Sequence, residues 1–235
     1  MSSEKKIIVS DSVGKDLGGL ISKLYSASEK KDGDFIIGLS GGSLPKFFAS
    51  GLEEMSSLDW SRVKFIFCDE RLVPYDDGES TWKAYKEALL GRVQGLEEKN
   101  FILVDVGLGS AEAAAKDYEN KIRSYAANGF DLLLLGMGPD GHTCSLFPGH
   151  PLLNEQSALV APISDSPKPP PSRVTLTFPA INKAKAVIFV STGEGKKAMI
   201  ENVVKKKLME YPAARVQPES RELFWILDKG AAANL

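Results

Sequence analysis

The chain has 235 residues, of which 43% are hydrophobic and 26% are charged, a balance that excludes a disordered, fibrous or disulfide-dense protein. Its 29 basic and 31 acidic residues leave a formal net charge of −2, so no global field attracts nucleic acid or an anionic membrane. We expect one globular domain over residues 1–235, and any anion that it binds must be bound locally. A monomer is expected, and a weak dimer is the alternative.

Cysteine usage and the amino-terminal sequence indicate the cellular compartment. Cys68 and Cys144 form no closely spaced pair, so neither a disulfide framework nor a cysteine-rich zinc site is predicted. The apolar run Ile7–Val9 is far shorter than a signal-peptide core or a membrane span. These features predict a cytoplasmic protein in a reducing environment.

Short apolar runs alternate with amphipathic stretches along the chain, which is the pattern of βαβ units. The predicted strands are Lys6–Ser10, Asp34–Leu39, Val63–Cys68, Phe101–Val104, Asp131–Gly136, Ala158–Pro162, Val174–Phe178, Ala186–Ser191 and Leu223–Leu227. The clearest predicted helices are Ser12–Lys30, Ser43–Met55, Thr81–Leu90, Ala111–Ala127 and Glu194–Met209. Leu132–Leu135 is apolar at every position, as in a strand covered on both faces. We predict an α/β fold of three αβα layers with a mainly parallel, doubly wound, Rossmann-like sheet.

Residues 162–171 contain five prolines and interrupt this pattern. Proline lacks a backbone N–H, so we expect neither helix nor ladder pairing in this segment. A proline-rich docking motif is one interpretation. A stiff loop within the domain is favoured, because the next predicted strand follows at once.

The first candidate site follows the predicted strand Asp34–Leu39. Four residues lie between this strand and the body of the next helix: Ser40, Gly41, Gly42 and Ser43. Backbone N–H groups and hydroxyls would converge there on an anion such as phosphate, with Ser43 placed to cap the helix. The Lys-Ser/Thr pair of a Walker A loop is absent after Gly42, which disfavours a nucleoside triphosphate. A tight structural turn is the alternative.

The second candidate is the charged run Asp69, Glu70 and Arg71, at the carboxyl end of the predicted strand Val63–Cys68. In open α/β sheets, ligands bind at this edge. Alternation along an extended chain directs Asp69 and Arg71 to one side and Glu70 to the other. An acid–base pair would then face the site together, whereas the alternative is a solvated turn with an internal ion pair.

The third candidate is the glycine-rich segment after the predicted strand Asp131–Gly136. Gly136, Gly138 and Gly141 match the GxGxxG pattern of dinucleotide sites. Prolines within and soon after the pattern prevent the helix that such a site requires. We therefore expect no dinucleotide cofactor.

The pair Asp140 and His142 lies in the same segment and is a candidate catalytic pair. Histidine exchanges protons near neutral pH, so His142 is a candidate general base. A histidine hydrogen-bonded to its own turn is the alternative. His150 lies between Gly149 and Pro151 and is interpreted as structural. The separation of the two histidines matches no preset metal-ligand spacing, so no metal is predicted.

Two cations occur at predicted strand edges. Arg173 precedes the predicted strand Val174–Phe178, and Lys196 lies at the start of the predicted helix Glu194–Met209. Arginine offers a bidentate fork to phosphate and lysine offers a point charge. Combined with the loop after Asp34–Leu39, they predict a phosphomonoester clamp, provided that the fold brings them together.

Five segments together resemble the 6-phosphogluconolactonases, a family in the superfamily that also includes glucosamine-6-phosphate deaminases. They are Gly38–Pro45, Asp69–Pro74, Leu135–Pro148, Arg173–Phe178 and Gly193–Lys197, in the order of the family and over nearly the whole chain. Residues 165–171 also look like the animal-type enzymes. The resemblance implies hydrolysis of 6-phospho-D-glucono-1,5-lactone to 6-phosphogluconate in the oxidative pentose phosphate pathway, without a cofactor.

The resemblance also implies roles for individual residues. His142 would be the base, and Asp69 and Arg71 would lie beside the reacting ring. The residues that match sugar-phosphate contacts are Ser40, Gly41, Gly42, Ser43, Arg173 and Lys196. Thr81 stands where many members carry Asn, so no polar role is implied there. Whether Lys197 shares the role of Lys196 is left open.

Two other functions are alternatives. A deaminase usually has Tyr in place of Arg71 and an Asn-Glu-Pro segment in place of Thr143–Phe147, so the lactonase is favoured. A sugar-phosphate sensing domain would carry a helix-turn-helix, for which the roughly thirty residues before the strand of the phosphate loop leave no room. In the lactonase hypothesis, the oxyanion is stabilised by backbone N–H groups or by Arg71, and the sequence does not decide between them.

Overall fold

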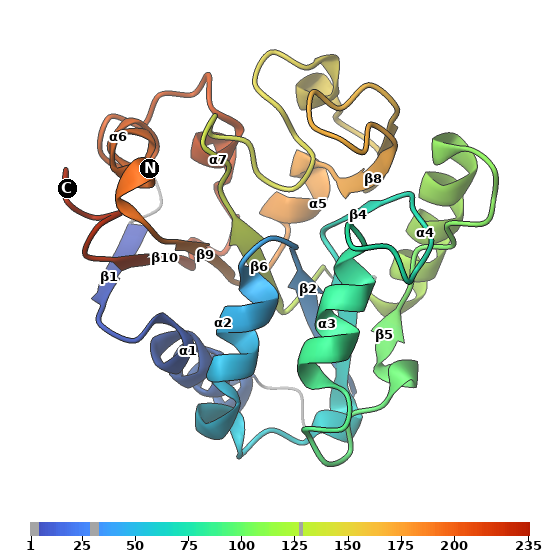
Figure 1. The fold of residues 1–235 in the computed structure, drawn as a ribbon, viewed down its shortest axis with the longest axis horizontal. Helices are drawn as coiled ribbons and strands as arrows, with labels where there is room; N and C mark the ends of the chain where they lie inside the picture. Colours follow the sequence, from blue (N-terminus) through green and yellow to red (C-terminus); the bar gives the residue numbers. More distant parts are fainter. Residues whose placement is uncertain (1–4, 29–32, 127–128) are drawn as a thin grey trace.

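The computed structural model of the protein describes residues 5–28, 33–126 and 129–235 (Figure 1). Within them, seven strands form a parallel sheet in the order β1-β10-β9-β6-β2-β3-β5. Their bounds are β1 Lys5–Ser10, β2 Phe35–Leu39, β3 Val63–Phe67, β5 Phe101–Ile102, β6 Leu132–Gly136, β9 Val187–Ser191 and β10 Leu223–Asp228. Every residue of β2 and β9 is buried, so the centre of the sheet is covered on both faces.

The order in which the chain adds strands to the sheet reverses between β2 and β6. From β2 the chain continues to β3 and β5 on one side, and it then returns to β6 on the other side of β2. The connections that follow β2 and β6 therefore diverge, and such a switch point forms a crevice at the carboxyl ends of the two strands. The predicted α/β fold with a mainly parallel, doubly wound sheet is confirmed.

Helices connect and cover the strands. Their bounds are α1 Val13–Ala27, α2 Leu44–Ser50, α3 Thr81–Leu89, α4 Ala111–Tyr125, α5 Phe178–Asn182, α6 Lys197–Ile200 and α7 Pro212–Arg215. Shorter helical turns are η1 Leu52–Met55, η2 Trp60–Arg62, η3 Glu98–Asn100, η4 Pro151–Asn154, η5 Glu194–Lys196 and η6 Glu201–Lys205. α1 packs against α2, and α2 packs against α3. The predicted ends of the first and fourth helices, Lys30 and Ala127, lie outside the described residues.

Two helices are shorter than the periodicity predicts. α2 ends before Gly51, where a Cβ would collide with the carbonyl oxygen of Gly14 in α1, so the two backbones are in direct contact. The predicted helix Glu194–Met209 is divided into the 3-10 turn η5, the short helix α6 and the π-helical turn η6. Lys196 therefore ends a 3-10 turn rather than beginning a long helix.

Three strands form a separate antiparallel sheet in the order β4-β8-β7, with bounds β4 Asp69–Arg71, β7 Val160–Ile163 and β8 Arg173–Leu176. The alternating pattern does not predict β4, and it wrongly places the other two segments among the strands of one sheet. The segment between β7 and β8 contains no crossover helix, which a parallel connection requires, so the two strands pair as an antiparallel hairpin.

The proline-rich segment begins later than predicted. A loop is predicted from residue 162, where the predicted strand Ala158–Pro162 ends, but β7 continues to Ile163, and Pro162 pairs with Val174. β7 is an edge strand, where a missing N–H on the outer side interrupts no ladder. Residues 164–172 between β7 and β8 contain no helix or strand, in agreement with the predicted loop.

One apolar core joins the two sheets. Buried residues of the parallel sheet, such as Phe65 and Trp225, are contiguous with Val174 and Leu176 of the small sheet. Only Cys68 separates β3 from β4, so the small sheet is attached at the carboxyl edge of the large one. The crevice at the switch point thus has walls from both sheets. None of the helices described is long and apolar enough to cross a membrane.

Candidate active site

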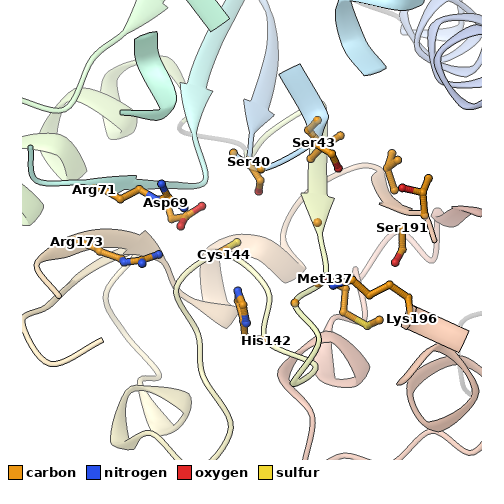
Figure 2. A pocket seen from close by; sticks show the side chains of 17 residues that line it. Ser40, Ser43, Asp69, Arg71, Met137, His142, Cys144, Arg173, Ser191 and Lys196 are labelled. Carbon is orange, nitrogen blue, oxygen red and sulfur yellow. Dashed lines mark hydrogen bonds between the residues drawn. The ribbon is translucent and has the colours of Figure 1, made fainter. Parts of the chain in front are cut away.

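A pocket of about 250 Å³ lies where β2 and β6 end (Figure 2). The sequence-predicted residues that line it are Ser40, Gly41, Gly42, Ser43, Asp69, Arg71, His142, Arg173 and Lys196. The remaining predicted residue, Asp140, is not part of this lining but contacts the ring of His142. The fold therefore gathers residues from distant segments at one sheet edge.

The loop after β2 presents polar groups to the pocket. Gly42 has a φ of 71°, a left-handed conformation that favours glycine. The Ser40 hydroxyl is buried and has no hydrogen-bond partner among the described residues. Ser43 occupies the N-cap position of α2, but its helical backbone angles prevent the predicted capping bond, and the side chain makes none. Both hydroxyls are thus left for a ligand.

β4 directs two charged side chains into the pocket. Asp69 and Arg71 line it, whereas Glu70 contacts α3 on the other side, which confirms the predicted alternation. The carboxylate of Asp69 accepts a 2.8 Å hydrogen bond from the Ser145 hydroxyl. Arg71 Nη1 donates to the carbonyl and carboxylate oxygens of Glu79, at 2.8 and 2.9 Å. These partners fix both side chains at the pocket wall.

Glu70 joins β4 to the amino end of α3. Its carboxylate accepts 2.8 Å hydrogen bonds from the backbone N–H groups of Thr81, Trp82 and Arg71. Burial raises the pKa of Glu70, and these N–H groups oppose the rise. Thr81 packs in turn against Gly41, where a Cβ would lie 3.1 Å from the threonine hydroxyl. The position of Thr81 is therefore explained by packing.

His142 lies in the turn after β6. Its Nδ1 is 2.5 Å from Asp140 Oδ1, and its ring packs on Phe147 with the ring centroids 4.7 Å apart. A Cβ on Gly138 would collide with the imidazole, so this position requires glycine. The chain after Gly141 continues as turns rather than as a helix, which agrees with the rejection of a dinucleotide site.

The loop between β7 and β8 contributes a residue that the sequence patterns do not identify. Lys168 Nζ lies 3.2 Å from His142 Nδ1 and 3.3 Å from Asp140 Oδ1.

Near the start of the loop, Asp165 Oδ1 lies 3.1 Å from Nε2 of His150, whose Nδ1 caps η4. His150 thus has structural contacts, in agreement with its interpretation.

The two predicted cations face the pocket from opposite sides of His142. Figure 2 shows Arg173 on the side of Arg71, and Lys196 on the side of Ser191. The sequence predicts a single clamp in which both cations hold one phosphate. Both side chains line the same pocket, Arg173 from the small sheet and Lys196 after β9 of the large one, and the clamp stays a prediction. The pocket therefore has a cationic side chain on each side of His142.

Arg173 is buried, and most of its donors are used inside the protein. Nε and Nη2 donate to the carbonyl oxygens of Lys168, Pro169 and Pro170 at 2.9 to 3.1 Å. Nη1 lies 3.4 Å from Ser145 Oγ, and this nitrogen carries a second N–H. Arg173 therefore holds the proline-rich loop and keeps at most one N–H for a ligand.

The Lys196 side of the pocket contains a further hydroxyl. Lys196 Nζ donates to the carbonyl oxygen of Met137 at 2.7 Å. Beside it, the Ser191 hydroxyl is buried, lines the pocket and has no partner among the described residues. The predictions omit Ser191, although it ends the predicted strand Ala186–Ser191. A serine at the carboxyl end of a parallel strand is the signal that identifies it.

Comparison with known proteins identifies the family. The sequence model of the glucosamine-6-phosphate isomerases/6-phosphogluconolactonase family matches residues 9–225. The chain belongs to this family. It is 46% identical to the rat 6-phosphogluconolactonase over 233 residues, covering 95% of this chain and 90% of the relative. The human 6-phosphogluconolactonase is 49% identical over 211 residues, covering 86% and 81%. The crystal structure of the Thermotoga maritima 6-phosphogluconolactonase matches with a TM-score of 0.84 at 29% identity, covering 96% and 100%.

In this member of the isomerase/lactonase family, burial and nearby charges shift the pKa values of the Asp140–His142 pair. Burial lowers the pKa of His142; Asp140 and Asp69 oppose this, and Lys168 lowers the pKa further. Burial raises the pKa of Asp140, but His142 and Lys168 outweigh it, so that pKa lies below its usual value. At neutral pH the pair is a carboxylate and a neutral imidazole. The ionised carboxylate accepts from His142 Nδ1, which leaves Nε2 as the basic nitrogen.

One of the two cysteines, Cys144, lies at the pocket. Its hydrogen bond with Cys68 and its burial raise the pKa of its thiol well above the usual value. A buried thiol with a raised pKa is a poor nucleophile, which argues against a nucleophilic role for Cys144. The described residues contain no group of three or more His, Cys, Asp or Glu that could hold a metal ion.

Proposed function

We propose that this lactonase hydrolyses 6-phospho-D-glucono-1,5-lactone to 6-phospho-D-gluconate in the oxidative pentose phosphate pathway, with His142 as general base and without a cofactor. The observation that carries the proposal is the Asp140–His142 pair at a pocket with a cationic side chain on each side of His142. The substrate is supported by relatives and solved structures that are named 6-phosphogluconolactonase.

The two ends of the pocket suit the two ends of the substrate. The phosphate is proposed to bind Ser40, Gly41, Gly42, Ser43 and Lys196, where hydroxyls, backbone N–H groups and an ammonium group are available. Ser191 belongs to the same end. At the opposite end, Arg71 is proposed to face the oxygens on C1, where negative charge develops. Arg173, which the sequence predicts as a phosphate ligand, has one N–H left for the substrate. Asp69 lies beside the ring at this end. Anchoring the remote phosphate holds C1 near His142.

His142 acts twice in the proposed reaction. Nε2 removes a proton from water while the water oxygen bonds to C1 and the carbonyl electrons move to the exocyclic oxygen. When this tetrahedral intermediate collapses, the bond between C1 and the ring oxygen breaks, and the imidazolium returns the proton to the ring oxygen. The product is a carboxylic acid with a free C5 hydroxyl, and the acid then releases its proton to water. Asp140 stabilises the transient imidazolium.

The variant His142→Gln tests the base. Its kcat should fall at least a hundredfold, since positioned acid–base groups contribute about 10²–10⁴ in rate. Glucose-6-phosphate dehydrogenase supplies the lactone and 6-phosphogluconate dehydrogenase reports the product, with spontaneous hydrolysis subtracted. Circular dichroism establishes that the variant is folded. Nearly normal turnover by a folded variant contradicts the assignment.

The proposal also covers domain organisation, cellular location and oligomeric state. The apolar core shared by both sheets supports a single catalytic domain over residues 1–235. A cytoplasmic monomer is proposed from the sequence, whereas a related plant enzyme is named chloroplastic. A fluorescent fusion and light scattering after size-exclusion chromatography test location and oligomeric state.

A further inference from the structure

Lys168 lies beside Asp140 and His142, and the proposed mechanism assigns it no role. Its ammonium lies within hydrogen-bond distance of both Asp140 Oδ1 and His142 Nδ1. The Lys168 side chain is 37% exposed and the His142 side chain 17%, so the contact is shielded from bulk water on the histidine side. A charge at this distance in a partly buried site acts on both partners.

The proline-rich loop fixes the backbone of Lys168. Ser166 Oγ accepts from the Lys168 N–H at 3.2 Å and donates to the Lys168 carbonyl oxygen at 2.9 Å. Arg173 Nη2 donates to the same carbonyl oxygen at 2.9 Å. Pro167 and Pro169 restrict φ on either side. The lysine is thus presented to the pair by a preorganised backbone, which lowers the entropy lost in holding it there.

A carboxylate beside a catalytic imidazole has two opposing effects. Asp140 orients the ring and selects the tautomer with a proton on Nδ1, but its charge also favours the imidazolium. A base that retains its proton cannot accept another. Lys168 has no acceptor, so it cannot take the Nδ1 proton; it donates to Asp140 and repels a second proton on the ring.

We propose that Lys168 is a positioning residue for the Asp140–His142 pair. Its ammonium donates to the same carboxylate as His142, so that Asp140 orients the imidazole but does not stabilise a second proton on it. This inference rests on the proposed function, in which His142 is the base. Two other charges act on the pair: Asp69 of β4 favours the imidazolium, and Lys196 of η5 interacts with both Asp140 and Lys168. Neither of these approaches the His142 ring through a direct contact as Lys168 does.

The experiment compares Lys168→Met and Lys168→Arg with the wild type. One readout is kcat/KM for the phosphorylated lactone against pH, and the other is the titration of the His142 ring followed by NMR in the free enzyme. The chain has two histidines, so the resonance lost in His142→Gln identifies His142. Lys205→Met removes a charge at an exposed site, where Nζ contacts Asn234, and serves as the matched control.

Removing the ammonium should raise the pH at which His142 gains its second proton. In Lys168→Met the acid limb of kcat/KM and the NMR midpoint both move to higher pH, and kcat/KM on that limb falls about tenfold. Lys168→Arg keeps a cation and retains most of the wild-type profile, and Lys205→Met is unchanged. Ser166→Ala loosens the loop and gives a smaller shift in the same direction, which provides a second variant should Lys168→Met fail to fold.

An unmoved acid limb and NMR midpoint in folded Lys168→Met overturn the proposal. A rise in KM alone, with both midpoints unmoved, also overturns it and assigns Lys168 to substrate binding. The outcome with His142→Gln separates this inference from the proposed function. If His142→Gln remains active, the base assignment fails; if it is inactive while Lys168→Met titrates normally, only the role of Lys168 fails.

Discussion

Gly138 shows what the glycine-rich segment does at the scale of a single residue. Its N–H donates to the His142 carbonyl oxygen at 2.9 Å, and its missing side chain leaves the space that the imidazole occupies. In a dinucleotide site the corresponding glycines admit a pyrophosphate. Here the same spacing admits a histidine ring, so the motif has a different physical cause.

Gly138→Ala should therefore disable catalysis without unfolding the protein. The new Cβ displaces the His142 ring, and a misplacement of about 1 Å can cost on the order of 10²-fold in rate. The coupled assay measures kcat/KM, and thermal unfolding measures stability. Gly19→Ala is the matched control, because a Cβ at Gly19 meets no atom within 4 Å. Wild-type kcat/KM in folded Gly138→Ala would show that the ring tolerates the methyl group.

At the scale of elements, Glu70 couples β4 to α3. One strand thus directs alternate residues to two tasks: Asp69 and Arg71 face the pocket, and Glu70 binds the first N–H groups of the helix. A carboxylate at a helix amino end satisfies donors that the helix itself leaves unpaired. The local charge pattern predicts the alternation, but the helix that Glu70 contacts is known only from the structure.

Glu70→Gln should destabilise the fold by about 1–3 kcal/mol at pH 7, because one carboxylate oxygen is replaced by an NH₂ group that cannot accept from Trp82 or Thr81. The pKa of Glu70 is raised in the folded state, so the folded protein binds more protons just above pH 4.5. Its ionisation therefore lowers stability as pH rises through that region. The variant lacks this contribution. Urea unfolding at several pH values measures both effects, and equal stability and pH dependence would refute the role of Glu70.

At the scale of the whole molecule, the pocket draws on both sheets. A ligand held at both ends should therefore stabilise the entire fold. At a concentration of 100 times its Kd, 6-phosphogluconate should add about 2.7 kcal/mol to the free energy of unfolding. For a chain of this size, this corresponds to a Tm increase of roughly 5–10 °C.

Thermal unfolding with 6-phosphogluconate and with gluconate checks this prediction. Gluconate, which lacks the phosphate, should give a much smaller shift at the same concentration. Lys196→Met should lose most of the response to 6-phosphogluconate, because its ammonium lies at the proposed phosphate end. Equal shifts with the two ligands would place the binding energy elsewhere than in the phosphate.

The sequence alone predicts the central strands, the loop after β2, the alternation of Asp69 and Arg71, and the segment that carries His142. These features depend on neighbours along the chain, such as apolar runs, glycines before a helix and period-two alternation. The family resemblance adds the reaction. Local patterns do not specify pairing partners, which explains why β7 and β8 are assigned to the wrong sheet.

Only the tertiary structure decides which distant groups meet. It separates Arg173 from Lys196, leaves the Ser191 hydroxyl without a partner at the pocket, and places Lys168 beside His142, 26 residues earlier in the chain. The physical reason is that such contacts follow from the packing of two sheets around one core. A proline-rich segment looks like a mere connection in the sequence, and its lysine acquires a partner only when β7 and β8 pair.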